Sequence, residues 1–481
     1  MIRRLALLLV LLVAFALSVP YVIGSPAETG GAAVDGPLFL PLLFGAGAPP
    51  VEPSDAPARI FAPHFSGEVR YAQTAIQWFG QVTPTDNYTD IRVGYNNNEL
   101  NINLSVVDRL LIYNDAPTAA TLTEWDSASI YLLVSSPGAP AERIYRFDAQ
   151  ASSWETARDA FETVYTYSGS GWTPVSIPFT SSAAWWGNAF NDQTEDRGWG
   201  LRSHIPFRNI GLTTPPAPGT TWKLGVTVQD RDSGALNAAV QQSAWPEGMD
   251  PLDTDTWGSL TFGLPVYNPP PSQPGGRVEI RHGLNGSVVV DGMVGGDTIC
   301  GDGMDFWVEW GLRNYAGRDQ VNIQNQANTE DWPCFSKFYL SFPLDRIPAG
   351  KVIRSASLKL YHFGNANPAL AERSLIQVLL TEGGFNETTL SWNNAPAAVE
   401  NVSQTWVNPL PDEDPDWPGV EITWDLSYAL SQVYPGSDFL HLVLYSADAP
   451  LHSGKYFSSS DMGEWNIAAR PALVVEWGEP E

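Results

Sequence analysis

The sequence predicts an all-β protein: two antiparallel, jelly-roll-like β-sandwich domains in tandem, joined by a proline-rich linker. Three observations support this fold class. The chain contains 42 Gly and 39 Pro, which disfavours helical bundles and coiled coils. Several segments alternate between apolar and polar residues, which is the period of a strand with one buried face. Clusters of Asn, Asp, Gly and Pro separate these segments, as in sandwiches built from many short strands.

The alternation is clearest in two segments. Residues 100–106 read LNINLSV, and residues 222–228 read WKLGVTV. Shorter strands are predicted elsewhere, at residues 338–342, 358–361, 441–445 and 472–477. One short helix is expected around Leu426 to Val433, because its apolar residues follow helical spacing and Pro435 stops the run.

The first 24 residues have the layout of a secretory signal peptide. A short basic start precedes an apolar run over Leu5–Val19, and small residues follow around Gly24. Residues 5–23 are also just long enough to span a bilayer as an uncleaved anchor. We favour cleavage, and expect residues 25–57 to be a Gly/Ala/Pro-rich tether. The protein is therefore expected to be secreted, extracellular or held at the cell surface.

A second boundary lies near the middle of the chain. Residues 264–276 read LPVYNPPPSQPGG, with five prolines. Such a run is semi-extended and cannot join the interior of a sheet. It divides the remaining chain into residues 58–263 and 277–478, each a suitable size for one sandwich domain.

The net charge of the chain limits the classes of molecule that it is expected to bind. The formal net charge is −27, from 53 acidic and 26 basic residues. Nucleic acid is excluded as a partner, because neutralising phosphates requires clustered Lys and Arg. Only 16% of residues are charged, so the acidic excess indicates solubility and cation binding.

No motif for catalysis is present. The chain has 6 His, none in the spacing of a zinc enzyme. It lacks the GxSxG elbow of α/β-hydrolases, the phosphate-binding loop of nucleotide-binding enzymes and the dinucleotide fingerprint. Pairs of carboxylates occur by chance among so many acidic residues and decide nothing. The sequence predicts a protein that is not an enzyme.

Tryptophan is the most informative residue type, with 19 in the chain. Pyranose rings have an apolar C–H face that stacks on indole, while nearby polar side chains bind hydroxyl groups. Candidate ligand-binding residues in loop-like contexts are Trp125, Asp126, Trp185, Trp186 and Trp257. The alternative is that most of these indoles are buried in the cores.

Two features of residues 277–478 suggest a metal site and a disulfide. Residues 291–305 read DGMVGGDTICGDGMD, and their carboxylates are candidate Ca²⁺ ligands. The alternative is a solvated acidic loop, since the spacing is not that of an EF-hand. The two cysteines are expected to form a structural disulfide in an exported protein. The candidate residues are Asp291, Asp297, Asp302 and Asp305 for the metal, and Cys300 and Cys334 for the disulfide.

Four stretches of residues 58–263 have a distinctive pattern of strands and spacings: YTDIRVGYNNNELNINLSVVDRLL (88–111), TEWDSASIYLLV (123–134), WGLRSHIPFRNIGLTTPPAPGTTWKLGVTVQDRD (199–232) and AWPEGMDPLDTDTWGSLTFG (244–263). With them, the segment resembles carbohydrate-binding module family 9 and the related DOMON-type domains. It implies a sandwich that binds sugar between aromatic rings, often with a structural calcium. Carried over by position, it points to Trp125 and Trp257 for stacking, and to Asp126 for hydroxyl groups or calcium.

Five stretches of residues 277–478 are more distinctive: RNYAGRDQVNIQ (313–324), FYLSFPLDRIPAGKVIRSASLKLYHFGN (338–365), FNETTLSWNNAP (385–396), ITWDLSYALSQVYPG (422–436) and KYFSSSDMGEWNIAARPALVVEW (455–477). With them, the segment is similar to the DNRLRE-type domain, which overlaps carbohydrate-binding module family 96. It implies a jelly-roll-like sandwich on an exported or polysaccharide-related protein. Phe385 stands where the family has Trp, and the region around Cys300 and Cys334 looks like an insertion.

Together these features predict a secreted or cell-surface, non-catalytic protein that binds polysaccharide or another glycan. The alternative is a structural surface, matrix or adhesion protein in which the same modules are scaffolding. Self-association is left open, and membrane contact is expected only through an uncleaved N-terminal segment.

Overall fold

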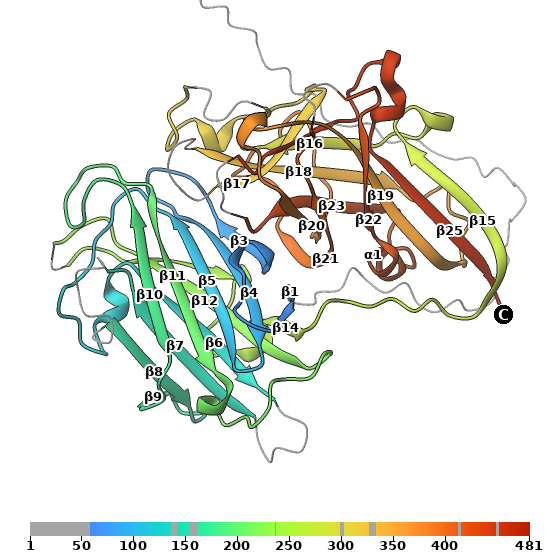
Figure 1. The fold of residues 1–481 in the computed structure, drawn as a ribbon. Helices are drawn as coiled ribbons and strands as arrows, with labels where there is room; N and C mark the ends of the chain where they lie inside the picture. Colours follow the sequence, from blue (N-terminus) through green and yellow to red (C-terminus); the bar gives the residue numbers. More distant parts are fainter. Residues whose placement is uncertain are drawn as a thin grey trace, which may run out of the picture. The chain divides into compact units, whose positions relative to one another are not determined.

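Antiparallel strands make up almost all regular structure in the computed structural model of the chain (Figure 1). The structure describes residues 58–135, 142–152, 161–235, 237–298, 303–326, 333–411, 415–448 and 452–481. The predicted signal peptide and tether lie outside the described residues, as do Cys300 and Asp302. Within the described ranges, no helix has the length and apolar character needed to cross a membrane.

The first sandwich is built from strands of residues 59–262. One sheet has the order β10–β11–β5–β4, with β2 and β3 also paired to β4. The facing sheet runs β9–β8–β7–β6–β12, with β13 and β14 beside β12 and β1 beside β14. Their bounds are β1 Arg59–Ala62, β2 His64–Phe65, β3 Ala75–Gly80, β4 Tyr88–Asn96, β5 Glu99–Val107, β6 Ser127–Val134, β7 Arg143–Gln150, β8 Glu162–Tyr167, β9 Trp172–Val175, β10 Thr180–Trp186, β11 Gly198–Pro206, β12 Thr221–Asp230, β13 Gln241–Trp245 and β14 Gly258–Phe262.

The second sandwich is built from strands of residues 272–480. One sheet has the order β16–β18–β23–β20–β21. The other runs β15–β25–β19–β22, with β24 also paired to β19 and β17 joining β24 to β18. Their bounds are β15 Ser272–Arg281, β16 Val290–Val294, β17 Gln320–Gln326, β18 Cys334–Pro343, β19 Val352–Asn365, β20 Ser374–Thr381, β21 Ala398–Val407, β22 Val420–Asp425, β23 Phe439–Ser446, β24 Lys455–Ser458 and β25 Ala472–Pro480.

The helices of the described residues are short and lie between strands. Among the described residues, the one α-helix is α1, Ser427–Val433, at the place the sequence predicts, and Asp425 Oδ1 accepts a hydrogen bond from the Ser427 N–H at 2.9 Å. The 3-10 turns are η1 Tyr71–Gln73, η2 Leu122–Glu124, η4 Phe207–Ile210, η5 Thr254–Thr256, η6 Leu284–Gly286, η7 Trp310–Leu312, η8 Pro368–Leu370 and η9 Glu464–Ala469.

The alternating segments form the strands that their pattern predicts. In β5, Leu100, Ile102 and Leu104 are buried in the core of the first sandwich, beside Trp199 and Trp222. The polar residues between them face the other side of the sheet, as the pleat requires. The six predicted strands correspond to β5, β12, β18, β19, β23 and β25.

The proline-rich run contributes to a strand at its end. Strand β15 begins at Ser272, inside residues 264–276, and pairs only with β25 among the described strands. Its register shifts between Pro274 and Arg277, which is a bulge. Proline is tolerated there because an edge strand at a bulge does not need every N–H in the ladder.

An aromatic cluster joins the two sandwiches. Trp78 and Tyr88 come from the first sandwich, and Trp392 and Tyr445 from the second. The ammonium of Lys337 lies 4.0 Å from the Trp78 ring centroid and 3.8 Å from that of Trp392. Burial lowers the pKa of this amine well below its usual value. The four rings stabilise the charged form by cation–π contact, which opposes part of that shift.

Buried polar contacts accompany this cluster. Asp90 forms an ion pair with Arg92 at 3.1 Å. The Asn325 amide donates to the same carboxylate at 2.8 Å, and Arg92 Nε donates to the Ala447 carbonyl at 3.1 Å. Because Asn325 and Ala447 belong to the second sandwich, separating the two would leave a buried charge pair partly unsatisfied.

Candidate functional site

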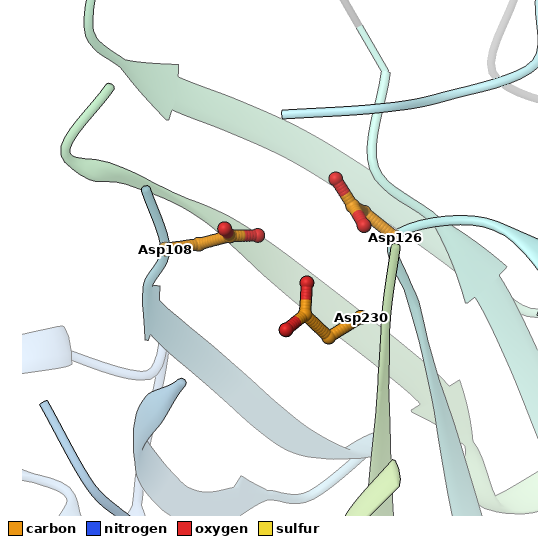
Figure 2. Close-up of side chains that lie close together, drawn as sticks. All are labelled: Asp108, Asp126 and Asp230. Carbon is orange, nitrogen blue, oxygen red and sulfur yellow. The ribbon is translucent and has the colours of Figure 1, made fainter. Parts of the chain in front are cut away.

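Three aspartates of the first sandwich converge at one end of its two sheets. Asp108 directly follows β5, Asp126 directly precedes β6, and Asp230 is the last residue of β12. Strands β6 and β12 are antiparallel partners, with Ser127 opposite Gln229, so the start of one lies beside the end of the other. One carboxylate oxygen of each aspartate lies within 4.8 Å of the others. Figure 2 shows the three side chains pointing toward one another.

All three carboxylates are buried, with exposed fractions of 1% for Asp108, 0% for Asp126 and 5% for Asp230. Asp108 accepts hydrogen bonds from the Leu110 N–H at 3.1 Å and from Trp199 Nε1 at 2.9 Å.

The carboxylates of Asp126 and Asp230 differ in the hydrogen bonds that they accept. Asp126 accepts from the Ile112 N–H at 2.5 Å and from the Arg231 N–H at 2.9 Å. Asp230 Oδ1 is buried and has no hydrogen-bond partner among the described residues. An unsatisfied buried oxygen is costly unless another group, such as a cation, completes its environment.

Burial raises the pKa of each carboxyl group, because it disfavours the charged form. The pKa of Asp108 rises to about 7 and that of Asp230 to about 9. The pKa of Asp126 rises well above its usual value, first through burial and then through the charges of Asp108 and Asp230. The three groups therefore cannot all be ionised near neutral pH without a compensating positive charge.

The two arginines that follow Asp108 and Asp230 in the sequence are engaged elsewhere. The Arg231 guanidinium donates to the carbonyls of Ser233 and Glu124, at 2.8 and 2.9 Å. Arg109 donates to the Pro84 carbonyl at 3.1 Å and pairs with Glu195 at 3.5 Å. Within the described ranges, no Arg, Lys or His forms an ion pair with the three aspartates.

The arrangement suits a hard divalent cation. Ca²⁺ prefers carboxylate and carbonyl oxygens, and this cluster offers three buried carboxylates. Asp126 was among the sequence candidates, whereas Asp108 and Asp230 were missed. The signal that would have found them is an acidic residue at the end of each alternating segment, LNINLSVVD and WKLGVTVQD.

Trp257 does not present a stacking surface, which corrects the sequence expectation. It is fully buried in a small cluster with Tyr131, Leu133 and Met249. Its ring centroid lies 5.5 Å from that of Tyr131, and its Nε1 donates to the Asp250 carbonyl at 2.8 Å. Turn residues preceding β14 fold the indole inward, so it serves packing.

The other candidate tryptophans are half-buried. The Arg231 guanidinium covers the Trp125 ring at 4.1 Å, so one face of that indole is occupied. Trp185 packs against the core and lies 5.0 Å from Phe190. Trp186 points to the opposite face of β10, where its ring lies over Gly200.

The acidic loop of the second segment does not bring its described carboxylates together. Asp291 is buried in β16 and accepts from the Ser460 N–H at 2.5 Å, and burial raises its pKa to about 8. Asp297 pairs with Arg318 at 3.6 Å. Asp305 accepts from the Trp307 N–H at 3.0 Å, which stabilises a local turn. Each serves a separate structural role.

The predicted disulfide stays a prediction. Cys334 is buried at the first position of β18. Its expected partner, Cys300, lies outside the described residues.

Comparison with known proteins shows that part of the second sandwich is similar to a known family. Residues 305–432 match the model of carbohydrate-binding module family 96. The resemblance stated from the sequence is thereby confirmed over these residues. No curated protein matches the chain.

Similar solved structures include two of a family 9 carbohydrate-binding module from Caldicellulosiruptor kristjanssonii. The complex with glucose is 14% identical, with a TM-score of 0.28, and the match covers 44% of this chain and 98% of that one. The complex with cellotriose is 13% identical, with a TM-score of 0.28, covering 44% and 100%. A protein of Bacteroides uniformis is 13% identical, with a TM-score of 0.31, covering 43% and 99%.

Proposed function

We propose that the protein is an exported, non-catalytic carbohydrate-binding protein that recognises a polysaccharide through aromatic side chains. The observation that carries this proposal is the match of residues 305–432 to carbohydrate-binding module family 96. An apolar N-terminal run with the layout of a signal peptide supports export.

We also infer that residues 58–263 and 277–478 are two separate modules. Two distinct core clusters support this division, one drawn from residues between Ile60 and Phe262 and the other from residues between Ile280 and Val475. The buried contacts around Lys337 then hold the modules together as a pair.

We further propose that Asp108, Asp126 and Asp230 bind one Ca²⁺. The unpartnered Asp230 Oδ1 supports this proposal, together with the raised pKa values that burial produces. Strand β5 belongs to one sheet, and β6 and β12 belong to the other. The ion would therefore link the two sheets of the first sandwich at one end. Its role is structural.

A glycan array probed with the full chain tests the function. The array is run once in calcium and once after EDTA treatment. We expect binding to at least one class of polysaccharide in calcium, with equal or weaker binding after EDTA. Absence of binding to every glycan, together with ordered self-association in solution, would favour the structural alternative and overturn the proposal.

A further inference from the structure

Two tryptophans of the second sandwich stand out by their exposure. Trp417 is 53% exposed and Trp465 is 66% exposed, whereas every other tryptophan in the described ranges is buried or half-buried. Their ring centroids lie 4.8 Å apart with an interplanar angle of 85°. Exposing two adjacent apolar side chains to water is energetically unfavourable. Such exposed apolar patches often mark binding sites. We call this pair the Trp417–Trp465 platform.

The segment that carries Trp465 is anchored to the sandwich. Trp465 lies in η9, and Arg470, at the end of that turn, pairs with Glu464 at 3.0 Å. Arg470 also donates to the Met462 carbonyl at 2.7 Å, and Arg281 of β15 donates to the Ile467 carbonyl at 3.2 Å. Such bonds limit the motion of the turn.

The segment that carries Trp417 leads directly into β22. A turn closed by the Gly419 N–H and the Asp416 carbonyl at 2.9 Å precedes the strand. Strand β22 then pairs along β19, with Glu421 opposite Tyr361. Both indoles are therefore held on anchored turns, which reduces the entropy lost when a ligand binds.

Charged and hydroxyl groups lie on β22, which follows Trp417, and on its partner β19. Glu421 accepts from Lys359 Nζ at 2.8 Å and from Tyr361 Oη at 3.2 Å. The Arg281 guanidinium lies 5.7 Å from the Tyr361 ring centroid. Sugar sites combine an apolar stacking surface with a few polar groups that bind hydroxyls, and the strands that adjoin the two turns carry such groups.

We propose that the Trp417–Trp465 platform is a binding site for a single chain of a neutral polysaccharide. This inference rests on the proposed function and assigns that function a location. Two indoles at 85° form a corner, which fits one sugar chain and does not match the flat face of a crystalline polymer. Lys359, Arg281 and Arg470 are each paired with a glutamate, and the chain carries a net charge of −27. Both features disfavour a polyanion.

Affinity electrophoresis with the full chain tests the inference. The gels contain mixed-linkage β-glucan, xylan, galactomannan or, as the acidic probe, polygalacturonate. The variants are Trp417→Ala, Trp465→Ala and the double variant. The control is Phe439→Ala, an aromatic residue that is 44% exposed on β23, in the other sheet. Urea unfolding confirms that each variant is folded.

We expect retardation of the wild type by at least one neutral polysaccharide. The dissociation constant should rise about tenfold or more in the double variant, because central aromatic contacts dominate binding energy. Phe439→Ala should bind as the wild type does.

Four results would overturn the inference. Equal binding by the wild type and the double variant would refute the site while leaving the proposed function intact. Binding to polygalacturonate alone would refute the ligand class. A dimer that forms in the wild type and is lost in the double variant, without any glycan binding, would show that a second copy of the chain occupies the platform. A wild type that binds no glycan refutes the proposed function and this inference together.

Discussion

Replacing Asp230 with asparagine tests whether this carboxylate binds a metal ion or is an ordinary buried carboxylate. Asp230→Asn keeps the shape of the side chain and removes one acidic group from the cluster with Asp108 and Asp126. If the cluster binds Ca²⁺, the variant loses most of the stabilisation that calcium gives. If the carboxylate only serves folding, the variant is less stable with or without calcium.

The sign of the pH dependence follows from the raised pKa values. In the calcium-free protein, burial raises the pKa of Asp108 to about 7 and that of Asp230 to about 9. The folded chain therefore holds more protons than the unfolded chain, whose aspartates titrate near pH 3.9. The stability from these protons is fully present below about pH 3.9, and it is lost as the pH rises through about 7 and then about 9.

The magnitude is several kcal/mol. Raising the pKa of Asp108 from 3.8 to about 7 corresponds to about 4 kcal/mol between the two protonation states, at about 1.4 kcal/mol for each pH unit. Calcium at 100 times its dissociation constant would add about 2.7 kcal/mol to the free energy of unfolding. In Asp230→Asn that gain should fall close to zero.

Urea unfolding at pH 5 and pH 8, in EDTA and in calcium, measures these quantities. The calcium-free wild type should be less stable at pH 8 than at pH 5, and calcium should reduce the difference. Asp255→Asn, at an exposed position of the same sandwich, is the control and should behave as the wild type does. An equal calcium gain in Asp230→Asn and wild type would refute the metal site.

The remaining predictions concern packing, charge and covalent structure. Trp257→Ala should lower the free energy of unfolding by about 3 to 5 kcal/mol without changing glycan affinity in electrophoresis. A loss of affinity in the folded variant would show that Trp257 binds the glycan after all. Burial lowers the pKa of Lys337, so in saturating calcium the wild type should gain stability as the pH rises toward about 10. Urea unfolding should show that Lys337→Met lacks this gain. The same gain in the variant and the wild type would contradict the prediction. If Cys300 and Cys334 form the predicted disulfide, a thiol assay of the unfolded, unreduced chain should detect no free thiol, and reduction should lower stability by about 4 kcal/mol.

The sequence predicts the strands well because their signal is local. In β5, Leu100, Ile102, Leu104 and Val106 enter the core, and the polar residues between them face away, so alternation alone places the strand. The helix α1 is equally local, since its apolar spacing and the following proline lie within one short segment.

The candidate site is harder to predict because its residues meet only in the folded chain. Asp108, Asp126 and Asp230 come from the ends of three strands in two sheets. Each looks like an ordinary turn residue until the strand order is known.

Tryptophan exposure is also set by tertiary contacts. Trp257 and Trp417 both lie in turns directly before strands. Tyr131 and Met249 cover the first, whereas the second contacts another exposed indole. No local pattern distinguishes the two.

The measurement that tests the central claim most directly is isothermal titration calorimetry of the full, calcium-loaded chain with oligosaccharides from the neutral polysaccharides named above. Carbohydrate binding predicts a saturable heat with at least one oligosaccharide, at a defined stoichiometry. The absence of saturable heat with every oligosaccharide and with polygalacturonate, from protein that unfolds cooperatively in urea, would contradict it.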